Sequence, residues 1–168
     1  MSDTLVVVDT SLGSFTIALD AERAPKSVAN FLAYVDAKHY DGTVFHRVID
    51  GFMAQGGGYD EAYEKRPVKA PVDNEAYNGL KNVRGTVAMA RTGEPHSATA
   101  QWFVNVADNK FLDHKDKTQA GWGYTVFGKV TDGMEVVEKM RVVKTGAHGP
   151  FAKDAPDVAI VIRSVRRG

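Results

Sequence analysis

The chain has 168 residues, in which 21 lysines and arginines balance 21 aspartates and glutamates, and it contains no cysteine. The length indicates one domain, residues 1–168, large enough to bury about 70% of the surface that the unfolded chain would expose. The lack of cysteine excludes disulfides, thiolate metal sites and thiol nucleophiles. The balanced charge is unlike the basic character of nucleic-acid-binding proteins, so no nucleic-acid partner is expected.

The apolar runs in the sequence are short. The run at residues 5–8 follows an aspartate and is too short for a secretory signal. No run approaches the roughly 18 apolar residues that indicate a membrane span. We therefore expect a soluble cytoplasmic protein without a membrane partner.

The first elements in chain order are a hairpin and a helix. Residues 5–10 and 14–20 show the alternation that is typical of paired strands. Pro25 suits the first position of a helix, and an apolar stripe follows it at helical spacing. The stripe consists of Val28, Phe31, Leu32 and Val35.

The rest of the chain alternates between short strands and irregular segments. Short β runs between Gly- and Asn-rich turns indicate a sandwich or a closed barrel, and the pattern alone does not choose between them. The irregular segments 56–84, 91–100 and 107–123 are long enough to suggest functional walls or lids. Further strands are predicted at 44–49, 52–55, 86–90, 101–106, 125–130 and 158–165, with a short helix at 134–140.

Several familiar catalytic and metal-binding patterns fail in this sequence. Glycines at 51 and 56–58 suggest a phosphate loop, but the required Lys-Ser/Thr pair and following helix are missing. We expect these glycines to let the backbone turn or approach another chain closely. The five histidines lack the spacing of a helical zinc site, and there is no Gly-x-Ser-x-Gly elbow. We expect neither a metal site nor a cofactor.

The strand at 101–106 has two unlike faces. Trp102, Val104 and Val106 alternate on one face, which they can fill as core. Phe103 is left on the other face between two amide side chains. It joins an apolar set beside the long loops, although core packing is the simpler interpretation for any single member. The apolar set is Phe52, Met53, Phe103, Phe111 and Leu112, and its polar complement is Arg47, Gln55 and Gln101.

Arg47 lies inside the apolar run 44–49, and arginine is almost never fully buried without a partner. Its side chain must therefore point outward or be paired. An outward arginine on a strand is ordinary, so the residues by themselves leave both a structural and a catalytic role open.

Residues 45–57 contain the runs Phe-His-Arg-Val-Ile and Phe-Met-Ala-Gln-Gly-Gly, which resemble the central motif of the cyclophilins. The resemblance covers essentially residues 5–165. It implies peptidyl-prolyl cis/trans isomerase activity in an external groove and a closed eight-stranded antiparallel β-barrel capped by two α-helices. Other matching segments are 82–90, 97–103, 111–113 and 126–130, while 94–101 and 121–124 are closest to the cytoplasmic bacterial (B-type) subtype.

The resemblance also implies roles for individual residues. Arg47 would be the catalytic side chain, assisted by Gln55, and Gln101 would be a polar groove residue. Ala90 and Arg91 would border the peptide backbone. The other implied substrate-binding residues are Phe52, Met53, Phe103, Phe111, Leu112 and Tyr124.

Two residues depart from the pattern of many eukaryotic cyclophilins. Phe111 stands where many members have tryptophan, and Tyr124 stands where many have histidine. Neither carries the implied chemistry, so isomerase activity is still expected. The drug cyclosporin is expected to bind weakly, because phenylalanine lacks the indole donor that helps to hold it.

The implied partners are proline-containing peptides and unfolded or folding proteins, and a monomer is expected. Two other functions remain as alternatives. A binding module or holdase would use the same groove without accelerating bond rotation. A barrel that holds a small ligand inside is disfavoured, because bulky Trp102, Val104 and Val106 share one strand face.

Overall fold

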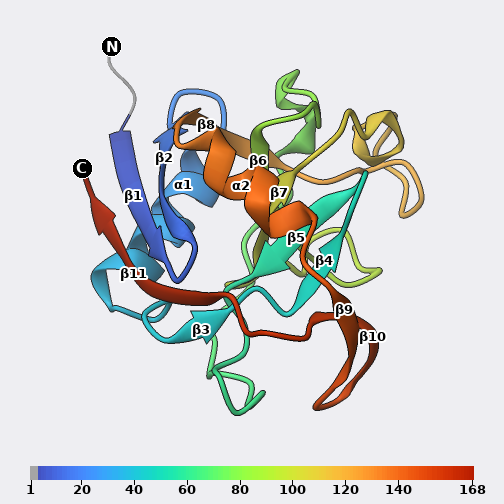
Figure 1. The fold of residues 1–168 in the computed structure, drawn as a ribbon. Helices are drawn as coiled ribbons and strands as arrows, with labels where there is room; N and C mark the ends of the chain where they lie inside the picture. The colour runs from blue at the N-terminus through green and yellow to red at the C-terminus, as the bar shows by residue number, and fades with distance from the viewer. Residues whose placement is uncertain (1–3) are drawn as a thin grey trace.

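The centre of the molecule is a curled antiparallel sheet of nine strands, seen in a computed structural model that describes residues 4–168 (Figure 1). The strand order is β3-β11-β1-β2-β8-β6-β7-β5-β4. In chain order the strands are β1 (Thr4–Thr10), β2 (Gly13–Leu19), β3 (Thr43–Val44), β4 (Arg47–Ile49), β5 (Met53–Gly56), β6 (Thr86–Met89), β7 (Trp102–Asn105), β8 (Val126–Asp132) and β11 (Val161–Arg167).

Two α-helices pack against this sheet, as predicted. Helix α1 (Pro25–Asp36) contacts β11, and α2 (Met134–Arg141) contacts β2, β4 and β5. Two short 3-10 helices, η1 (Ala76–Asn78) and η2 (Lys110–Leu112), interrupt the long loops. The expectation of a mainly β protein with two helices is therefore confirmed.

The sheet is open, which corrects the predicted closed barrel of eight strands. Strand β3 pairs with β11 and ends at Val44, whereas β4 pairs with β5 and begins at Arg47. Phe45 and His46 lie between these two ladders: Phe45 is buried in the main core, whereas His46 is buried against the ring of Phe151. The predicted strand 44–49 is therefore two strands. These two strands, β3 and β4, form the opposite edges of the sheet. They follow each other in the chain, but no strand-to-strand hydrogen bonds pair them.

A second sheet, the hairpin of β9 (Thr145–His148) and β10 (Phe151–Pro156), was not predicted. Its sequence has little apolar alternation, so it lacks the usual strand pattern. Tertiary contacts hold it instead. The Phe151 ring stacks on His46 with 5.0 Å between centroids and meets Tyr59 edge-on at 4.9 Å. The hairpin thus covers the segment that leads from β3 into β4.

The inside of the curled sheet is filled by side chains. Trp102 is fully buried there, and Phe31 of α1 meets its ring edge-on with 5.8 Å between centroids. Val104 and Val106 belong to the same core, as the strand pattern predicted. The predicted stripe of α1 faces this core, with Leu32 only partly buried. A filled interior argues against a barrel that holds a ligand inside.

Gly57 and Gly58 lie where segments of this same chain approach closely. Gly57 has a φ of +90°, and a Cβ there would lie 2.9 Å from both the Trp102 indole nitrogen and the Tyr40 ring. A Cβ at Gly58 would lie 2.5 Å from the Gln101 side chain. A larger residue at position 58 would therefore displace Gln101.

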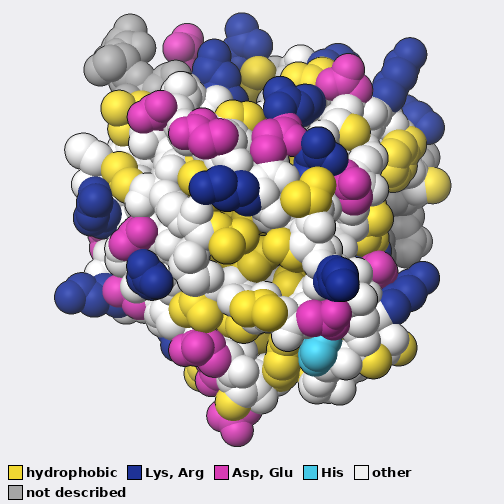
Figure 2. All heavy atoms as spheres, in the orientation of Figure 1, with side chains coloured by type: hydrophobic (Ala, Val, Ile, Leu, Met, Phe, Trp, Pro, Cys, Tyr) yellow, Lys and Arg dark blue, Asp and Glu magenta, His cyan; other side chains and the backbone are white. Residues whose placement is uncertain are grey.

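Figure 2 shows the face of the molecule that carries α2. Acidic and basic side chains alternate over this face, and hydrophobic side chains gather in a patch just below the helix. Within residues 4–168, no helix is long and apolar enough to cross a membrane. The same residues contain no group of three or more histidine, aspartate or glutamate side chains that could hold a metal ion.

Candidate active site

A shallow pocket of about 120 Å³ opens on the side of the sheet opposite the main core. Nine of the residues singled out from the sequence form its lining, and they come from strands and loops that are far apart in the chain. Among the implied site residues, Gln101 and Phe111 lie outside this lining. The lining residues are Arg47, Phe52, Met53, Gln55, Ala90, Arg91, Phe103, Leu112 and Tyr124.

Antiparallel pairing aligns three of these residues on neighbouring strands. Arg47 of β4 lies opposite Gln55 of β5, and Gln55 lies opposite Phe103 of β7. Directly opposed residues project to the same face of a sheet, with Cβ atoms about 4.5–5.5 Å apart. The register of the sheet therefore sets Arg47, Gln55 and Phe103 in one row.

The floor of the pocket is a small apolar core of its own. Phe103, which the strand pattern left among amide side chains, is only 4% exposed, and Tyr124 meets its ring edge-on at 5.9 Å. Core packing and pocket lining thus describe the same residue. The floor cluster consists of Met53, Ala88, Ala90, Phe103, Leu112 and Val126.

Arg47 stands at the rim of the pocket and is exposed. Its guanidinium carbon lies 6.0 Å from the centroid of the Phe52 ring. No ion pair between residues 4 and 168 includes it. Its neighbour Gln55 donates from Nε2 to Oε1 of Gln101 at 2.9 Å. Of the two options that the sequence left for Arg47, the structure therefore shows the outward one.

His46 precedes Arg47 but is buried beneath the β9–β10 hairpin, with 3% exposure. Burial, with a smaller contribution from the charge of Arg47, lowers its pKa to about 4. Its Nδ1 has no hydrogen-bond partner in the described part of the chain. The imidazole is therefore neutral at pH 7, and Arg47 is the cation of this segment.

A second cavity of about 150 Å³ adjoins the pocket and shares Gln55, Ala90 and Arg91 with it. Gln101 lines this second cavity. Arg91 is held in the shared wall, because its Nε donates to the Gly123 carbonyl at 3.0 Å and its guanidinium lies 4.4 Å from the centroid of the Tyr124 ring. The two cavities together form one groove.

Phe111 lies outside both cavities. It is 65% exposed on η2, and its ring centroid lies 5.5 Å from that of Phe52. The residue therefore extends the apolar wall of the pocket towards solvent.

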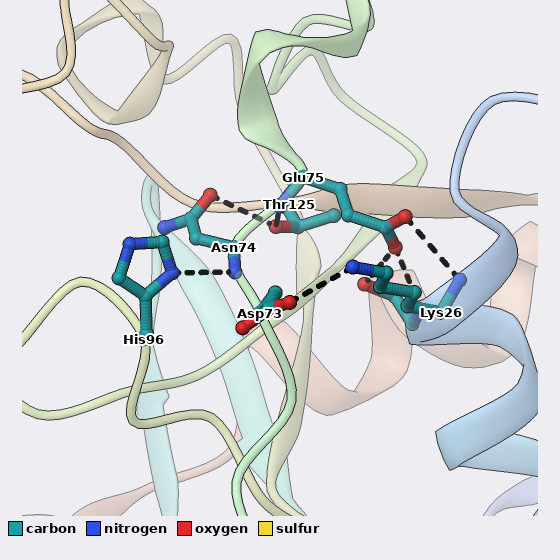
Figure 3. A network of polar contacts seen from close by, with 7 residues as sticks. Lys26, Asp73, Asn74, Glu75, His96 and Thr125 are labelled. Carbon is teal, nitrogen blue, oxygen red and sulfur yellow. Dashed lines mark hydrogen bonds and ion pairs between the residues drawn. The ribbon is translucent and has the colours of Figure 1, made fainter.

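The long loops beside the groove are joined by hydrogen bonds of the buried Asn74 (Figure 3). Its Nδ2 donates to the carbonyls of Pro95 and Gly123, at 3.1 and 3.0 Å. Its backbone nitrogen donates to Nδ1 of His96 at 3.1 Å. The Asn74 side chain thus connects the loop that carries Arg91 with the loop that precedes β8.

Glu75, beside Asn74, anchors these loops to α1. Its carboxylate accepts hydrogen bonds from the backbone nitrogen and the hydroxyl of Ser27, at 2.7 and 2.8 Å. This is the first turn of α1, where the helix dipole favours a negative charge. The exposed ion pair of Lys26 with Asp73 lies next to it, and such pairs contribute little. Polar contacts between distant segments therefore order the irregular stretch 56–84.

Comparison with known proteins identifies the family. Residues 5–167 match the family model described as cyclophilin type peptidyl-prolyl cis-trans isomerase/CLD. The chain is 53% identical over 161 residues to "Peptidyl-prolyl cis-trans isomerase cyp18" of Streptomyces antibioticus, covering 96% of each chain. It is 49% identical over 161 residues to "Peptidyl-prolyl cis-trans isomerase B" of Escherichia coli, covering 96% of this chain and 98% of that protein. The chain belongs to the cyclophilin-type peptidyl-prolyl cis-trans isomerases.

A solved cyclophilin has the same fold. It is a Cryptosporidium parvum cyclophilin type peptidyl-prolyl cis-trans isomerase, crystallised in the presence of the dipeptide Ala-Pro. The TM-score is 0.77 at 25% sequence identity, and the match covers 98% of both chains. The resemblance drawn from the sequence motifs, including the relation to bacterial cyclophilins, is thereby confirmed.

Three buried asparagines behind the pocket of this cyclophilin, Asn82, Asn105 and Asn109, were not singled out as site residues from the sequence. Asn105 carried one signal, its place on the same strand face as Phe103. Asn82 and Asn109 lie in irregular segments, where spacing carries no information about which side chains meet. Their contacts with one another exist only in the folded chain.

Proposed function

We propose that the groove binds a proline-containing peptide with the prolyl ring in the apolar pocket, and that Arg47 catalyses rotation about the preceding peptide bond. The observation that carries this proposal is the register, which sets Arg47 and Gln55 opposite each other at the rim of a pocket with a buried apolar floor. An apolar ring gains free energy by leaving water for such a floor. The bond to be rotated then lies at the rim, beside the guanidinium.

Rotation is slow without a catalyst because amide resonance sets a barrier of about 18–20 kcal/mol, so that exchange takes tens to hundreds of seconds. At the twisted transition state the prolyl nitrogen loses conjugation and regains a lone pair. A donor that reaches this nitrogen only at that point stabilises the transition state more than either ground state. The guanidinium of Arg47 is always charged and rich in donors, which suits this role. The step makes and breaks no covalent bond.

Gln55 is proposed to orient Arg47 and the peptide. Its Nε2 already donates to Gln101, so its own oxygen is left to accept from the guanidinium or from a peptide N–H. Arg91 has its side chain engaged by Gly123 and Tyr124. Ala90 and Arg91 would therefore meet the peptide mainly through main-chain groups.

The test of this role is Arg47→Ala. A charge-assisted hydrogen bond contributes roughly 1.5–3 kcal/mol, so turnover should fall about tenfold to somewhat over a hundredfold. Folding should be preserved, because Arg47 is exposed and takes part in no described ion pair. NMR exchange spectroscopy on a short X-Pro peptide measures turnover, and circular dichroism checks the fold.

A folded Arg47→Ala variant that isomerises the peptide as fast as the parent would overturn the role of Arg47. A parent protein that binds the peptide without accelerating its isomerisation would instead indicate a binding module or holdase. The dipeptide present with the solved relative belongs to the proposed substrate class, which supports choosing an Ala-Pro peptide for this assay.

We further propose a monomer that acts in the cytoplasm on proline-containing segments of unfolded or folding proteins. Refolding of a protein whose slow step is proline isomerisation, with and without this protein, tests the choice of substrate. Light scattering tests the oligomeric state, and cell fractionation tests the location.

Cyclosporin should inhibit weakly. Phe111 is exposed beside Phe52 at the edge of the pocket and has no N–H to donate. Inhibition measured in a titration should strengthen in Phe111→Trp, which supplies an indole donor at this position. Nanomolar inhibition of the parent protein would contradict the proposal.

A further inference from the structure

Three asparagine side chains form a buried chain of hydrogen bonds behind the pocket. Asn82, Asn105 and Asn109 are 1%, 0% and 3% exposed. Nδ2 of Asn109 donates to Oδ1 of Asn105 at 2.8 Å, and Nδ2 of Asn105 donates to Oδ1 of Asn82 at 3.0 Å. We call these three side chains the amide chain.

Both ends of the amide chain bond to the backbone of pocket residues. At one end, Nδ2 of Asn109 donates to the Phe52 carbonyl at 2.8 Å. At the other end, Nδ2 of Asn82 donates to the carbonyls of Leu112 and Tyr124, each at 3.3 Å. These three pocket residues belong to the β4–β5 turn, to η2 and to the loop before β8, and no strand ladder joins these segments. The Tyr124 backbone nitrogen donates directly to the Leu112 carbonyl at 2.8 Å, so these two walls are also bonded to each other.

The direction of the amide chain is determined by its neighbours. Thr86 uses its hydroxyl hydrogen to donate to the Val83 carbonyl at 2.7 Å, so the same oxygen can only accept the second hydrogen bond from Nδ2 of Asn105, at 2.9 Å. Nδ2 of Asn82 also donates to Oδ1 of Asp113 at 3.2 Å. Reversing one amide would therefore oppose donor to donor in a buried site, which is costly.

We propose that Asn82, Asn105 and Asn109 are positioning residues, which hold Phe52, Leu112 and Tyr124 at the spacing that grips a prolyl ring. The proposal rests on the proposed proline pocket. The backbone of all three wall residues is attached to one rigid, directional set of buried hydrogen bonds. Packing of Phe103 forms the floor of the pocket, whereas the amide chain sets the distance between Phe52 and the directly bonded pair of Leu112 and Tyr124.

The amide chain and Arg47 should have different kinetic effects. Contacts between the walls and the prolyl ring are equally present before and during rotation, because the ring stays in the pocket. Loss of these contacts weakens the binding of the substrate and of the transition state equally, which raises KM and leaves kcat unchanged. The contact of Arg47 with the prolyl nitrogen forms only during rotation, so its loss lowers kcat. A role of the amide chain in folding alone would move neither constant in the folded protein.

The first test variant is Asn109→Ala. The Phe52 carbonyl keeps a second donor, the backbone nitrogen of Val106 at 3.1 Å, so the variant leaves no orphaned carbonyl there. We expect KM for a short Ala-Pro peptide to rise about fivefold or more, the equivalent of one hydrogen bond, with kcat within about twofold of the parent. The Kd from an NMR titration should rise in parallel.

A second variant, Thr86→Val, keeps the shape of a partly exposed residue and removes the acceptor that orients Asn105, together with the hydroxyl donor to the Val83 carbonyl. It should raise KM about twofold, and it decides the question if Asn109→Ala does not fold. The matched control is Ser27→Ala, which removes a buried hydroxyl bonded to Glu75 at the start of α1. The control should lower the melting temperature and leave KM and kcat as in the parent.

The proposal is overturned if the folded variants keep the parental KM, or if kcat falls while KM does not change. The same assays separate it from the proposed function. Loss of kcat in Arg47→Ala supports that function whatever the asparagine variants do. If the parent protein binds the peptide without turning it over, the isomerase mechanism fails, and the Kd values still decide whether the amide chain shapes the pocket.

Discussion

Phe103 in the floor of the pocket and Arg47 at its rim lie on strands β7 and β4, on either side of β5, but differ in burial. Phe103 in the floor is 4% exposed and packed among apolar neighbours, whereas Arg47 is exposed and in no described ion pair. In the proposed mode of binding, stability and the binding of the prolyl ring therefore depend on the same residues in the floor. At the rim, chemistry can be changed with little effect on the fold. The following predictions test this contrast, beginning with the largest expected effect.

Phe103→Ala should damage both the fold and binding. Removing a buried phenylalanine costs about 3–5 kcal/mol, from lost transfer free energy and from the cavity left behind. The Ala-Pro peptide should lose its site as well. Urea unfolding measures the first effect and an NMR titration the second. A variant that remains as stable as the parent but fails to bind the peptide would show that stability and peptide binding do not depend on the same side chain.

Acid should destabilise the segment beneath the rim through His46. The folded protein holds its pKa at about 4, while an unfolded histidine has a pKa near 6.5. Between these values the unfolded state binds the extra proton, so the contribution of His46 is present above pH 6.5 and is lost as the pH falls towards 4. The loss amounts to about 2–3 kcal/mol at pH 4.5.

The measurement for His46 is urea unfolding at pH 7 and pH 4.5, compared with His46→Leu. The variant should lose less stability over this range, because it has no imidazole to protonate and other groups titrate equally in both proteins. Identical pH dependence in the two proteins would show that His46 is not a buried neutral histidine.

Arg47→Lys should slow turnover without affecting stability. Lysine keeps the positive charge but lacks the planar fork of donors, so kcat should fall about five- to tenfold, or roughly 1–1.4 kcal/mol. Parallel measurement of KM gives the discriminating readout. A rise in KM with kcat retained would place Arg47 among the binding residues and remove the contrast between rim and floor.

Phe111→Ala should have the smallest effect. The side chain is 65% exposed, and its main contact is the ring of Phe52 at 5.5 Å. Loss of an aromatic pair of this kind costs about 0.5–1.5 kcal/mol, so KM should rise a few-fold at most, with the melting temperature almost unchanged. A loss of binding as large as that of Phe103→Ala would show that the pocket depends on its outer wall as much as on its floor.

Local patterns in the sequence were sufficient for much of the fold. Alternation predicted the paired strands β1 and β2, and helical spacing after Pro25 predicted α1. The inward face of strand β7, with Trp102 and Val104, was also predicted correctly. The predicted strand 158–165 was less accurate, because β11 begins at Val161 and Val158 is 83% exposed. A β-branched residue near a strand need not belong to it.

The residues of the candidate site were named from sequence motifs and not from periodicity. Family resemblance named Arg47, Gln55 and Phe103, and only the strand register shows that the three lie in one row. Periodicity alone had left Arg47 with two interpretations. It tells which face of an element a side chain occupies, but not which other element lies opposite.

The sequence by itself determined where most elements form and which of their faces are apolar, because both depend on residues close together in the chain. Tertiary structure alone decided that run 44–49 divides between two sheet edges, that the weakly patterned hairpin at Phe151 packs on His46, and that three distant asparagines meet behind the pocket. Each of these depends on partners brought together from distant parts of the chain, and no local pattern records such partners.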